Sequence, residues 1–381
     1  MKPKRIILLI DAQNKTTYRS NGRDRKMKLT DFDKNMVIDT DIKKDDIVWL
    51  DAKDVPFSLH GVHYAEDEKG YVRIDAETGK SISSGVDYLR RHTAGGRVRF
   101  RTDSPYIAIR AVQQNDGPMS HMPLTGQSGF DLYRDTGDGR GELYYTTFRP
   151  PMGVKNGFSS WADTDCADAE YTINFPLYDF VGELYIGLQK DCSIDPPKPY
   201  HIQKPVVYYG SSITQGGCAS RPGNAYQAIL SRLLGCDHVN LGFSGSAKGE
   251  QAMADYISTL DMSVFVCDFD HNASGVEELS RVHLPFLRRI REKRPELPII
   301  IISAPDVLLK TKGFGPRREI IRKNYETLVS EGDKNVYFID GGELFAGDCW
   351  DSCTVDGAHP NDLGFYRMAR RIEKTLAPLL S

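Results

Sequence analysis

The hydrophobic pattern of the chain changes its period near residue 205. Between Ile47 and Gln189, short runs alternate apolar and polar residues and are separated by turn residues, as in Tyr106-Ile-Ala-Ile-Arg110 and Phe130-Asp-Leu-Tyr133. This period of two, with many aromatic and β-branched residues, indicates antiparallel strands that bury one face. Because the runs recur at intervals of roughly 8–12 residues, we expect an all-β sandwich of jelly-roll type.

From residue 206 onward, nearly continuous apolar runs alternate with helical patterns. Strands are expected at 206–209, 239–243, 264–269, 299–303 and 336–340, and helices at 224–234, 249–260, 276–294, 317–329 and 363–380. Such strands are typical of a parallel sheet whose two faces are both covered by helices. The second half is therefore predicted to be α/β, a three-layer α/β/α domain with about five parallel strands.

Four prolines between Lys190 and Pro205 mark the break between the two patterns. We expect a β-sandwich domain at 1–190, a proline-rich linker at 191–204 and the α/β domain at 205–381. A chain of 381 residues is long enough for two domains of ordinary size.

The charge and the cysteine content argue against several classes of protein. A net charge of −3 gives no electrostatic reason to propose nucleic acid or an anionic membrane as a partner. No apolar run approaches the ~18–20 residues that cross a bilayer. The seven cysteines are irregularly spaced, which predicts free thiols in a reducing cytoplasm rather than a disulfide framework. The oligomeric state is not specified by any of these patterns.

The first ten residues begin with basic side chains, as a signal peptide does. The apolar stretch that follows is only five residues long, and Asp11 interrupts it without a small-residue cleavage site. We therefore expect Met1–Ile10 to form a strand or an arm, and we expect a cytoplasmic protein.

Residues that can carry chemistry follow the expected strands of the second half. Gly210-Ser-Ser-Ile-Thr214 follows the first strand, Gly242-Phe-Ser-Gly-Ser246 the second and Asp268-Phe-Asp-His-Asn272 the third, and Asp356-Gly-Ala-His359 precedes the last helix. Taken singly, each segment is also compatible with an ordinary turn or helix cap. Ligand sites in open parallel sheets lie at the carboxyl ends of the strands, so all four segments are expected to meet at one edge.

The gathered groups fit nucleophilic catalysis of acyl transfer. A serine hydroxyl becomes a good nucleophile when an imidazole accepts its proton, and the imidazole needs a carboxylate to hold its other nitrogen. A spacing of three places Asp356 within reach of His359. The backbone N–H groups of Ser212 and Gly245 and the side-chain amide of Asn272 are candidate donors to the oxyanion of the tetrahedral intermediate.

At these residues the sequence resembles the SGNH (GDSL-type) hydrolase superfamily, over roughly residues 205–380. Gly210–Thr214 is similar to the serine block of that family, Asn240–Gly245 to its glycine block and Asp356–His359 to its D-x-x-H block. The family usually has Asp where Ser211 stands, and its third block usually reads G-x-N-D where this chain has Phe269-Asp-His-Asn272. The chain also lacks the G-x-S-x-G motif of ordinary α/β-hydrolases.

The resemblance implies roles for individual residues. It implies Ser212 as the nucleophile, His359 as the base, Asp356 as the carboxylate that orients it, and Gly245 and Asn272 in the oxyanion hole. The first half resembles, less specifically, the jelly-roll domain that precedes the hydrolase domain in a subgroup of these esterases. Members of that subgroup are often linked to acyl groups on sugars.

Three further residues are candidates for substrate binding. His121 lies on a long loop of the first half, and it is either solvent-exposed or part of a loop that reaches over the catalytic edge and shapes the acyl pocket. Arg221 and Tyr226 follow the serine block, and they either line a substrate groove or serve as a helix cap and a packed aromatic. Seven other histidines make no ligand-like spacing with Asp, Glu or Cys, so no catalytic metal and no cofactor are expected.

The leading hypothesis is a serine esterase that removes a small acyl group, acetyl first, from a carbohydrate or a similar polar metabolite through an acyl-enzyme on Ser212. The choice of substrate follows from the resemblance. Two alternatives stay open, an acyltransferase that uses the same acyl-enzyme and a catalytically inert carbohydrate-binding protein.

Overall fold

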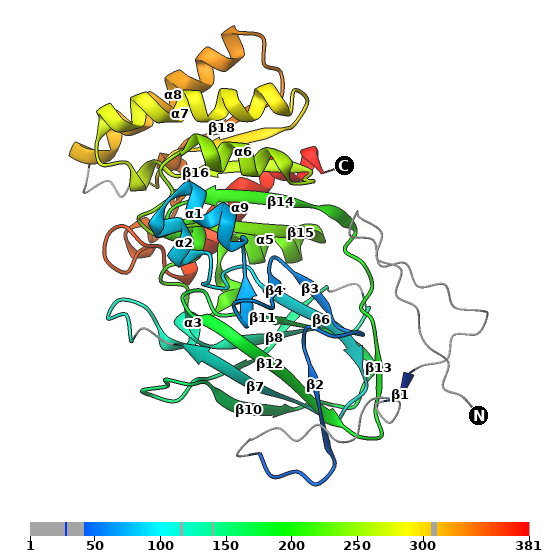
Figure 1. Cartoon of the computed structure of the whole chain (residues 1–381). Helices are drawn as coiled ribbons and strands as arrows, with labels where there is room; N and C mark the ends of the chain where they lie inside the picture. The colour runs from blue at the N-terminus through cyan, green and yellow to red at the C-terminus, as the bar shows by residue number, and fades with distance from the viewer. Residues whose placement is uncertain (1–26, 29–41, 115–116, 139–140, 306–310, 381) are drawn as a thin grey trace.

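The computed structural model describes residues 27–28, 42–114, 117–138, 141–305 and 311–380. The arm expected at Met1–Ile10 lies outside these ranges. Figure 1 shows a β-sandwich made by the first half of the chain and, above it, an α/β part made by the second half. None of the helices within the described ranges is long and apolar enough to span a bilayer.

The sandwich consists of two facing antiparallel sheets. One has the strand order β1-β13-β6-β11-β8-β9, with β3 also paired to β6, and the other has the order β10-β7-β12-β2. The strands are β1 (Met27–Lys28), β2 (Ile47–Asp51), β3 (Ser58–His60), β6 (Arg97–Thr102), β7 (Tyr106–Gln114), β8 (Phe130–Asp135), β9 (Leu143–Phe148), β10 (Phe158–Asp163), β11 (Ala169–Asn174), β12 (Phe180–Gln189) and β13 (Ser193–Asp195). Inward-facing side chains of both sheets, among them Phe100, Ile109 and Leu132, form a single core. The expected antiparallel sandwich is confirmed.

Strand pairing continues into the segment that the prolines indicated as a linker. β13 pairs with β6 and β1, and Ile194 is fully buried in the sandwich core. The first strand of the α/β part, β14 (Ile202–Gly210), already begins before Pro205. The prolines at 196, 197 and 199 therefore occupy only the short stretch between β13 and β14, where no ladder hydrogen bond is needed.

Two adjacent helices of the first half, like the later four-residue helix α3 (Leu124–Gln127), were not expected from its alternating pattern. They are α1 (Ala76–Ile82) and α2 (Ser84–Leu89), which follow the small hairpin β4 (His63–Ala65) and β5 (Gly70–Val72). Asp75 caps α1 by accepting from the Thr78 N–H at 2.8 Å, and Ser83 caps α2. Val86 and Leu89 are buried against the α/β part, so the tertiary contact fixes helices whose own sequence pattern is weak.

The α/β part is a five-stranded parallel sheet of order β15-β14-β16-β17-β18 between two layers of helices. Its remaining strands are β15 (Cys236–Gly242), β16 (Val264–Asp268), β17 (Ile299–Ile302) and β18 (Val336–Ile339). Its longer helices are α5 (Tyr226–Leu234), α6 (Gln251–Thr259), α7 (Val276–Lys293), α8 (Thr311–Ser330) and α9 (Asp362–Leu376). These elements confirm the expected three-layer fold and begin and end within a few residues of the expected positions, apart from the earlier starts of β14 and α8.

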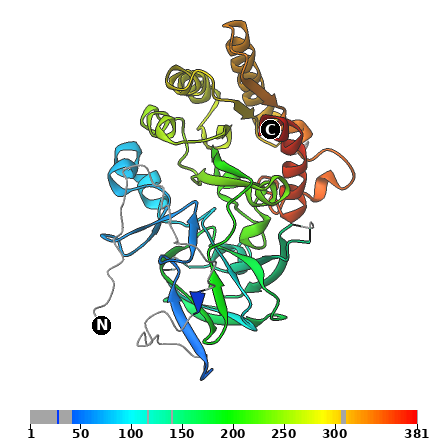
Figure 2. The ribbon, with the colours of Figure 1, turned by 90° about the vertical axis from the view of Figure 1, so that its right-hand side faces the viewer.

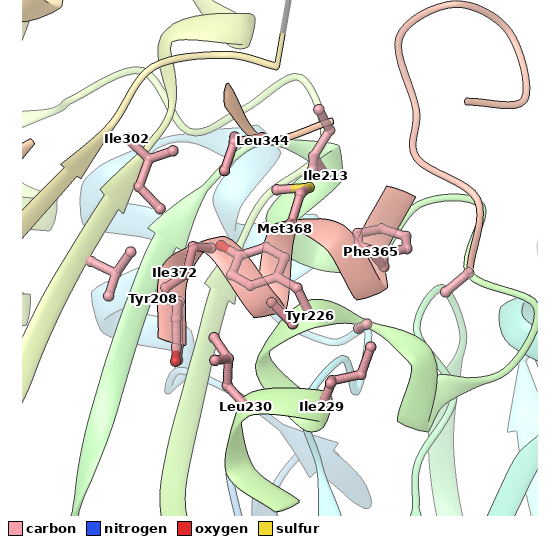
Figure 3. Close-up of a cluster of buried hydrophobic side chains, with 14 of the residues drawn as sticks. Tyr208, Ile213, Tyr226, Ile229, Leu230, Ile302, Leu344, Phe365, Met368 and Ile372 are labelled. Carbon is pink, nitrogen blue, oxygen red and sulfur yellow. The ribbon is translucent and has the colours of Figure 1, made fainter. Parts of the chain in front are cut away.

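Alternate residues of each strand enter the two helical layers. Tyr208 of β14 packs with α5 and α9, as Figure 3 shows with Tyr226, Phe365 and Met368, whereas its neighbour Tyr209 packs with α6 and α7. Seen from the side in Figure 2, α6 and α7 (yellow-green) lie on one side of the sheet and α9 (red) on the other. Because helices cover both faces, the strand ends are the part of the sheet that remains for chemistry.

Buried polar groups join the sandwich to the α/β part. Asp131 of β8 is fully buried and accepts hydrogen bonds from Asn174 Nδ2 and the Gly223 N–H, both at 2.8 Å, and from Arg221 Nη1 at 3.2 Å. Burial raises the pKa of Asp131, and the charge of Arg221 and these hydrogen bonds oppose the rise. Arg221 also donates to the hydroxyl of Tyr133.

A second junction lies at the end of β15. The buried Arg73, which follows β5, donates to the carbonyl oxygens of Asn240 at 3.0 Å and Gly242 at 2.6 Å, and to that of Leu89 at 2.7 Å. Burial lowers the pKa of this guanidinium to about 9. Arg73 thereby ties the first half of the chain to the strand end that precedes Gly245.

Asp131→Ala is expected to lower the free energy of unfolding by about 3–5 kcal/mol, because it leaves Arg221 without its buried counter-charge and the Gly223 N–H without an acceptor. The measurement is the urea unfolding curve of the full chain. Asp165→Ala, which removes an ion pair between Arg134 and a solvent-exposed carboxylate, is the matched control and should cost less than about 1 kcal/mol. Equal losses for the two variants would contradict the role given to Asp131.

Candidate active site

Ser212 lies where the strand order of the parallel sheet reverses. β14 ends at Gly210 between β15 and β16, and Ser212 is the first residue of the short helix α4 (Ser212–Gln215). Ser211 is the N-cap of α4, and its side chain accepts a hydrogen bond from the Ile213 N–H at 3.2 Å. Ser and Asp are about equally good N-caps, so the serine at position 211 keeps the turn that presents Ser212.

Ser212, His359 and Asp356 form a continuous hydrogen-bonded chain. The Oγ atom of Ser212 lies 2.8 Å from Nε2 of His359, and Nδ1 of His359 lies 2.8 Å from Oδ2 of Asp356. An ionised carboxylate only accepts, so the Nδ1 proton of His359 points to Asp356 and Nε2 is free to accept from Ser212. The structure thus brings together the three residues that the sequence singled out.

The electrostatics of Asp356 keep it in the form that this chain requires. Partial burial raises the pKa of Asp356, but hydrogen bonds from the backbone N–H groups of His359 and Ala358, at 2.8 and 3.0 Å, and from the imidazole outweigh burial and lower the pKa to about 2. The carboxylate therefore stays ionised at neutral and mildly acidic pH.

The loops that carry Gly245 and Asn272 are hydrogen-bonded to each other and to α4. Asn272 ends the short 3-10 helix η3 (Asp270–Asn272) after β16, and its Nδ2 donates to the Phe243 carbonyl at 3.0 Å. The neighbouring Ser244 N–H donates to Gln215 Oε1 of α4 at 3.0 Å. A carboxamide has two N–H groups, so one N–H of Asn272 remains for a ligand.

Gly245 has the backbone freedom and the open surroundings of a ligand-binding position. Its φ is +66°, in the left-handed region, and among the described residues no atom beyond Gly245 and its two chain neighbours lies within 4 Å of the place where a Cβ would be. A substrate can therefore approach this backbone directly.

Asp270, where the third block departs from the family pattern, has a structural contact. Its side chain is buried, and Oδ2 accepts from the Ala304 N–H at 2.9 Å, which ties η3 to the end of β17. Burial raises the pKa of Asp270 to about 6. Asp270 thus differs from the family pattern, and its side chain anchors the loop that carries Asn272.

His121 lies at the catalytic edge. Its ring centroid is 5.4 Å from that of His359, although it belongs to a loop of the sandwich that precedes α3 (Leu124–Gln127). Of the two alternatives for this loop, the structure therefore has the one in which it reaches over the edge. A groove of about 610 Å³ lies here between the two halves, lined by Ser120, His121, Met122 and Pro123 on one side and by Cys218, Ser220, Val355, Asn361, Asp362 and Leu363 on the other.

The two candidates that follow the serine block lie elsewhere. Tyr226 is fully buried, where its ring stacks on Phe365 and meets Tyr208 edge-on, so the prediction that it lines a groove is wrong. The amphipathic α5 turns this tyrosine inward to cover the sheet. Arg221 is engaged by Asp131 and by the ring of Tyr144, 4.0 Å away, so it joins the two halves instead of lining the groove.

The turn after α4 was not identified from the sequence as part of the site. Gly216, Gly217 and Cys218 return the chain beside the imidazole, and a Cβ on Gly217 would lie 3.3 Å from Cδ2 of His359 and 3.0 Å from the hydroxyl of Tyr178. That hydroxyl donates to the Ser212 carbonyl at 3.2 Å. The glycine pair directly after the serine block was the available signal for this close approach.

Comparison with known proteins agrees with this fold and site. Residues 203–377 match the GDSL-like Lipase/Acylhydrolase family, and residues 47–194 match the N-terminus of Esterase_SGNH_hydro-type proteins. No curated protein sequence matches the chain. The α/β part belongs to the SGNH (GDSL-type) hydrolases, and the sandwich matches the domain that forms the N-terminus of Esterase_SGNH_hydro-type proteins. It is an ester-hydrolysing serine hydrolase.

Solved structures share the whole two-part architecture. A protein described as a GDSL-like lipase from Bacteroides ovatus ATCC 8483 superposes with a TM-score of 0.79 at 29% identity, over 88% of this chain and 98% of that one. The salicylyl-acyltransferase SsfX3 from a tetracycline biosynthetic pathway (TM-score 0.68, 21% identity) and a family two carbohydrate esterase from Cellvibrio japonicus (0.58, 11%) match over the same shares of both chains. At these lower identities the likeness is one of fold.

Proposed function

We propose that this enzyme is a carbohydrate esterase that hydrolyses small acyl esters, acetyl first, with Ser212 as nucleophile, His359 as general base and Asp356 as the orienting carboxylate. The observation that carries the proposal is the unbroken hydrogen-bonded chain from Ser212 Oγ through both nitrogens of His359 to Asp356. A chain of this geometry removes the serine proton as the oxygen attacks a carbonyl carbon.

The reaction follows from the positions of these groups. Ser212 Oγ bonds to the ester carbon while its proton moves to Nε2 of His359, and the resulting imidazolium is stabilised by Asp356. The tetrahedral intermediate collapses, the C–O bond to the alcohol breaks, and the alcohol leaves with the proton from Nε2. Water then attacks the acyl-enzyme, gives one proton to Nε2 and releases the acid, and that proton returns to Ser212.

The oxyanion of each tetrahedral intermediate needs hydrogen-bond donors. We assign this role to the backbone N–H groups of Ser212 and Gly245 and to the remaining N–H of Asn272. The hydrogen bonds that join the loops of Gly245 and Asn272 support the assignment, because they hold the donors in place before the charge develops.

The substrate class is supported by the groove and by the architecture. The groove beside His121 is open, and its walls carry both polar and apolar side chains. The polar side chains of Ser120, Asn361 and Asp362 suit a hydroxyl-rich substrate better than a long lipid chain. The family two carbohydrate esterases and an acetyl xylan esterase from Butyrivibrio proteoclasticus share the two-part fold. His121 would then contact the part of the substrate that lies between the two halves.

A second candidate is an acyltransferase. This function is favoured by the similarity in fold to the salicylyl-acyltransferase, whose structure superposes with a TM-score of 0.68. The two functions share the acyl-enzyme and differ only in whether water or a second alcohol attacks it. An inert carbohydrate-binding protein, the other alternative, is set aside because the chain belongs to an ester-hydrolysing family.

Ser212→Ala is expected to lower kcat for p-nitrophenyl acetate on the order of 10⁴-fold or more, because it removes the attacking oxygen, and His359→Ala should have a similar effect. Covalent labelling by a fluorophosphonate, followed by intact mass, should be lost in Ser212→Ala. Ser274→Ala, an exposed serine near the η3 loop, is the control and should keep both activity and label. Full activity in the Ser212 and His359 variants would make the assignment wrong.

Asn272→Ala is expected to lower kcat by about 10²–10³-fold with little change in KM, because the donor acts on the oxyanion and not on the bound ester. The measurement is steady-state kinetics with p-nitrophenyl acetate. The variant also loses the hydrogen bond to Phe243, so its thermal unfolding is compared with that of the original chain under assay conditions. A change confined to KM would exclude Asn272 from the oxyanion hole.

Acetylated oligosaccharides distinguish the two candidate functions. For an esterase, mass spectrometry should show loss of acetyl groups and free acetate, and an excess of an acceptor sugar should leave the yield of acetate unchanged. The rate of hydrolysis should be higher for p-nitrophenyl acetate than for p-nitrophenyl esters with longer acyl chains. If the added acceptor instead captures most of the acyl groups, the protein is the transferase.

A further inference from the structure

Three side chains that bind metals converge at the groove. The ligand atoms of His121, Cys218 and His359 all lie within 4.8 Å of one another. They come from the sandwich loop before α3, from the turn after α4 and from the loop before α9. The reaction described above uses His359, but it gives Cys218 no role.

Cys218 is held in place by its backbone. It is 2% exposed and has a φ of +75°, one of four positive values for residues other than glycine in the described part of the chain. Burial and then the charge of Asp356 raise the pKa of its thiol to about 12. A neutral, buried thiol is a poor nucleophile, whereas a metal ion that coordinates it displaces the proton.

His359 is already oriented as a metal ligand. Asp356 holds the Nδ1 proton, so the Nε2 lone pair points toward Ser212. A carboxylate behind a histidine fixes the tautomer and raises ligand basicity in many zinc sites. The lone pair that accepts the serine proton is thus also the one that binds a metal.

The chemistry of the three donors selects the cation. Two imidazole nitrogens and one sulfur suit Zn²⁺ and disfavour Mg²⁺ and Ca²⁺, which prefer oxygen. Zn–N and Zn–S bonds of about 2.0–2.3 Å place the ligand atoms of a tetrahedral site roughly 3.3–3.6 Å apart. The ligand atoms of the three residues, which lie within 4.8 Å of one another, would have to move closer to bind one ion, and the Ser212 hydroxyl or a water would take the fourth position.

We propose that Zn²⁺ binds reversibly to His121, Cys218 and His359 and switches the enzyme off. Binding replaces the hydrogen bond between Ser212 and His359 by a metal–nitrogen bond, and the thiol proton of Cys218 leaves to solvent. Neither oxidation nor reduction occurs. The binding is independent of the proposed catalytic reaction, but the inhibition rests on it, because His359 must be the base for the loss of its lone pair to stop turnover.

Cobalt spectroscopy tests the binding without reference to activity. The full-length protein, stripped with EDTA and then freed of chelator, should give a thiolate-to-cobalt absorption band with one equivalent of Co²⁺, and Zn²⁺ should abolish the band. Cys218→Ser and His121→Gln should lose or weaken it, whereas Cys349→Ser, an exposed cysteine outside the cluster, should keep it. Absence of the band, or its persistence in Cys218→Ser, overturns the proposal.

Inhibition tests the consequence. Hydrolysis of p-nitrophenyl acetate by the metal-free protein should fall with added Zn²⁺ and return with EDTA. The inhibition constant, measured against the metal-free rate of each variant, should rise at least about tenfold in Cys218→Ser and in His121→Gln, because even outer-shell partners contribute that much to metal affinity. An unchanged constant in both variants contradicts the site. If the protein gave the cobalt band but had no esterase activity, the metal site would stand and the proposed function would be wrong.

Discussion

Burial of both faces of the five-stranded sheet is the constraint on which the rest of the structure depends. α5 and α9 cover one face and α6, α7 and α8 cover the other, so the apolar side chains of the strands within the described residues pack against helices. Polar groups can then gather at the ends of the strands. At β14 the strand order reverses, so the connections that leave β14 and β15 run to opposite sides of the sheet and are separated from each other there. Ser212, the Gly245 loop and Asn272 all occupy such ends, and the last helix begins beside them with His359 just before it.

The β-sandwich contributes residues to the candidate site, although it lies before the α/β part in the sequence. Asp131 and Tyr133 bind Arg221, which follows Ser212 in the chain, and Arg73 binds the carbonyl groups that precede the Gly245 loop. The same half of the chain contributes the His121 loop that forms one wall of the groove. The fully buried carboxylate of Asp131 in β8 thus joins the sandwich to the segment that follows Ser220 in the wall of the groove.

The sequence allowed the succession of strands and helices in the second half, and the proximity of Ser212, His359 and Asp356, to be predicted, because the signals are local. The hydrogen bond between Asp356 and His359 spans three residues, and Ser212 directly follows a strand whose apolar run is unmistakable. The contacts between the halves were not predictable in this way. The sequence left two alternatives open for the His121 loop and two for Tyr226, and it did not indicate that Cys218 lies beside His121 and His359. Such contacts depend on tertiary packing, which hydrophobic period does not encode.

The geometry that supports the proposed role of His359 as base is also the geometry of a metal ligand. An imidazole fixed by Asp356 must present an unprotonated Nε2 to the groove, and any site that does so presents a ligand for a transition metal as well. In most such sites a single exposed imidazole binds metals weakly, because affinity grows with the number of fixed ligands. Here the turn after α4 and the sandwich loop bring Cys218 and His121 to the same place. The proposed metal site therefore follows from the way the two halves meet at the groove, and a relative that lacked the cysteine or the loop histidine would keep the hydrogen-bonded chain of Ser212, His359 and Asp356 without that site.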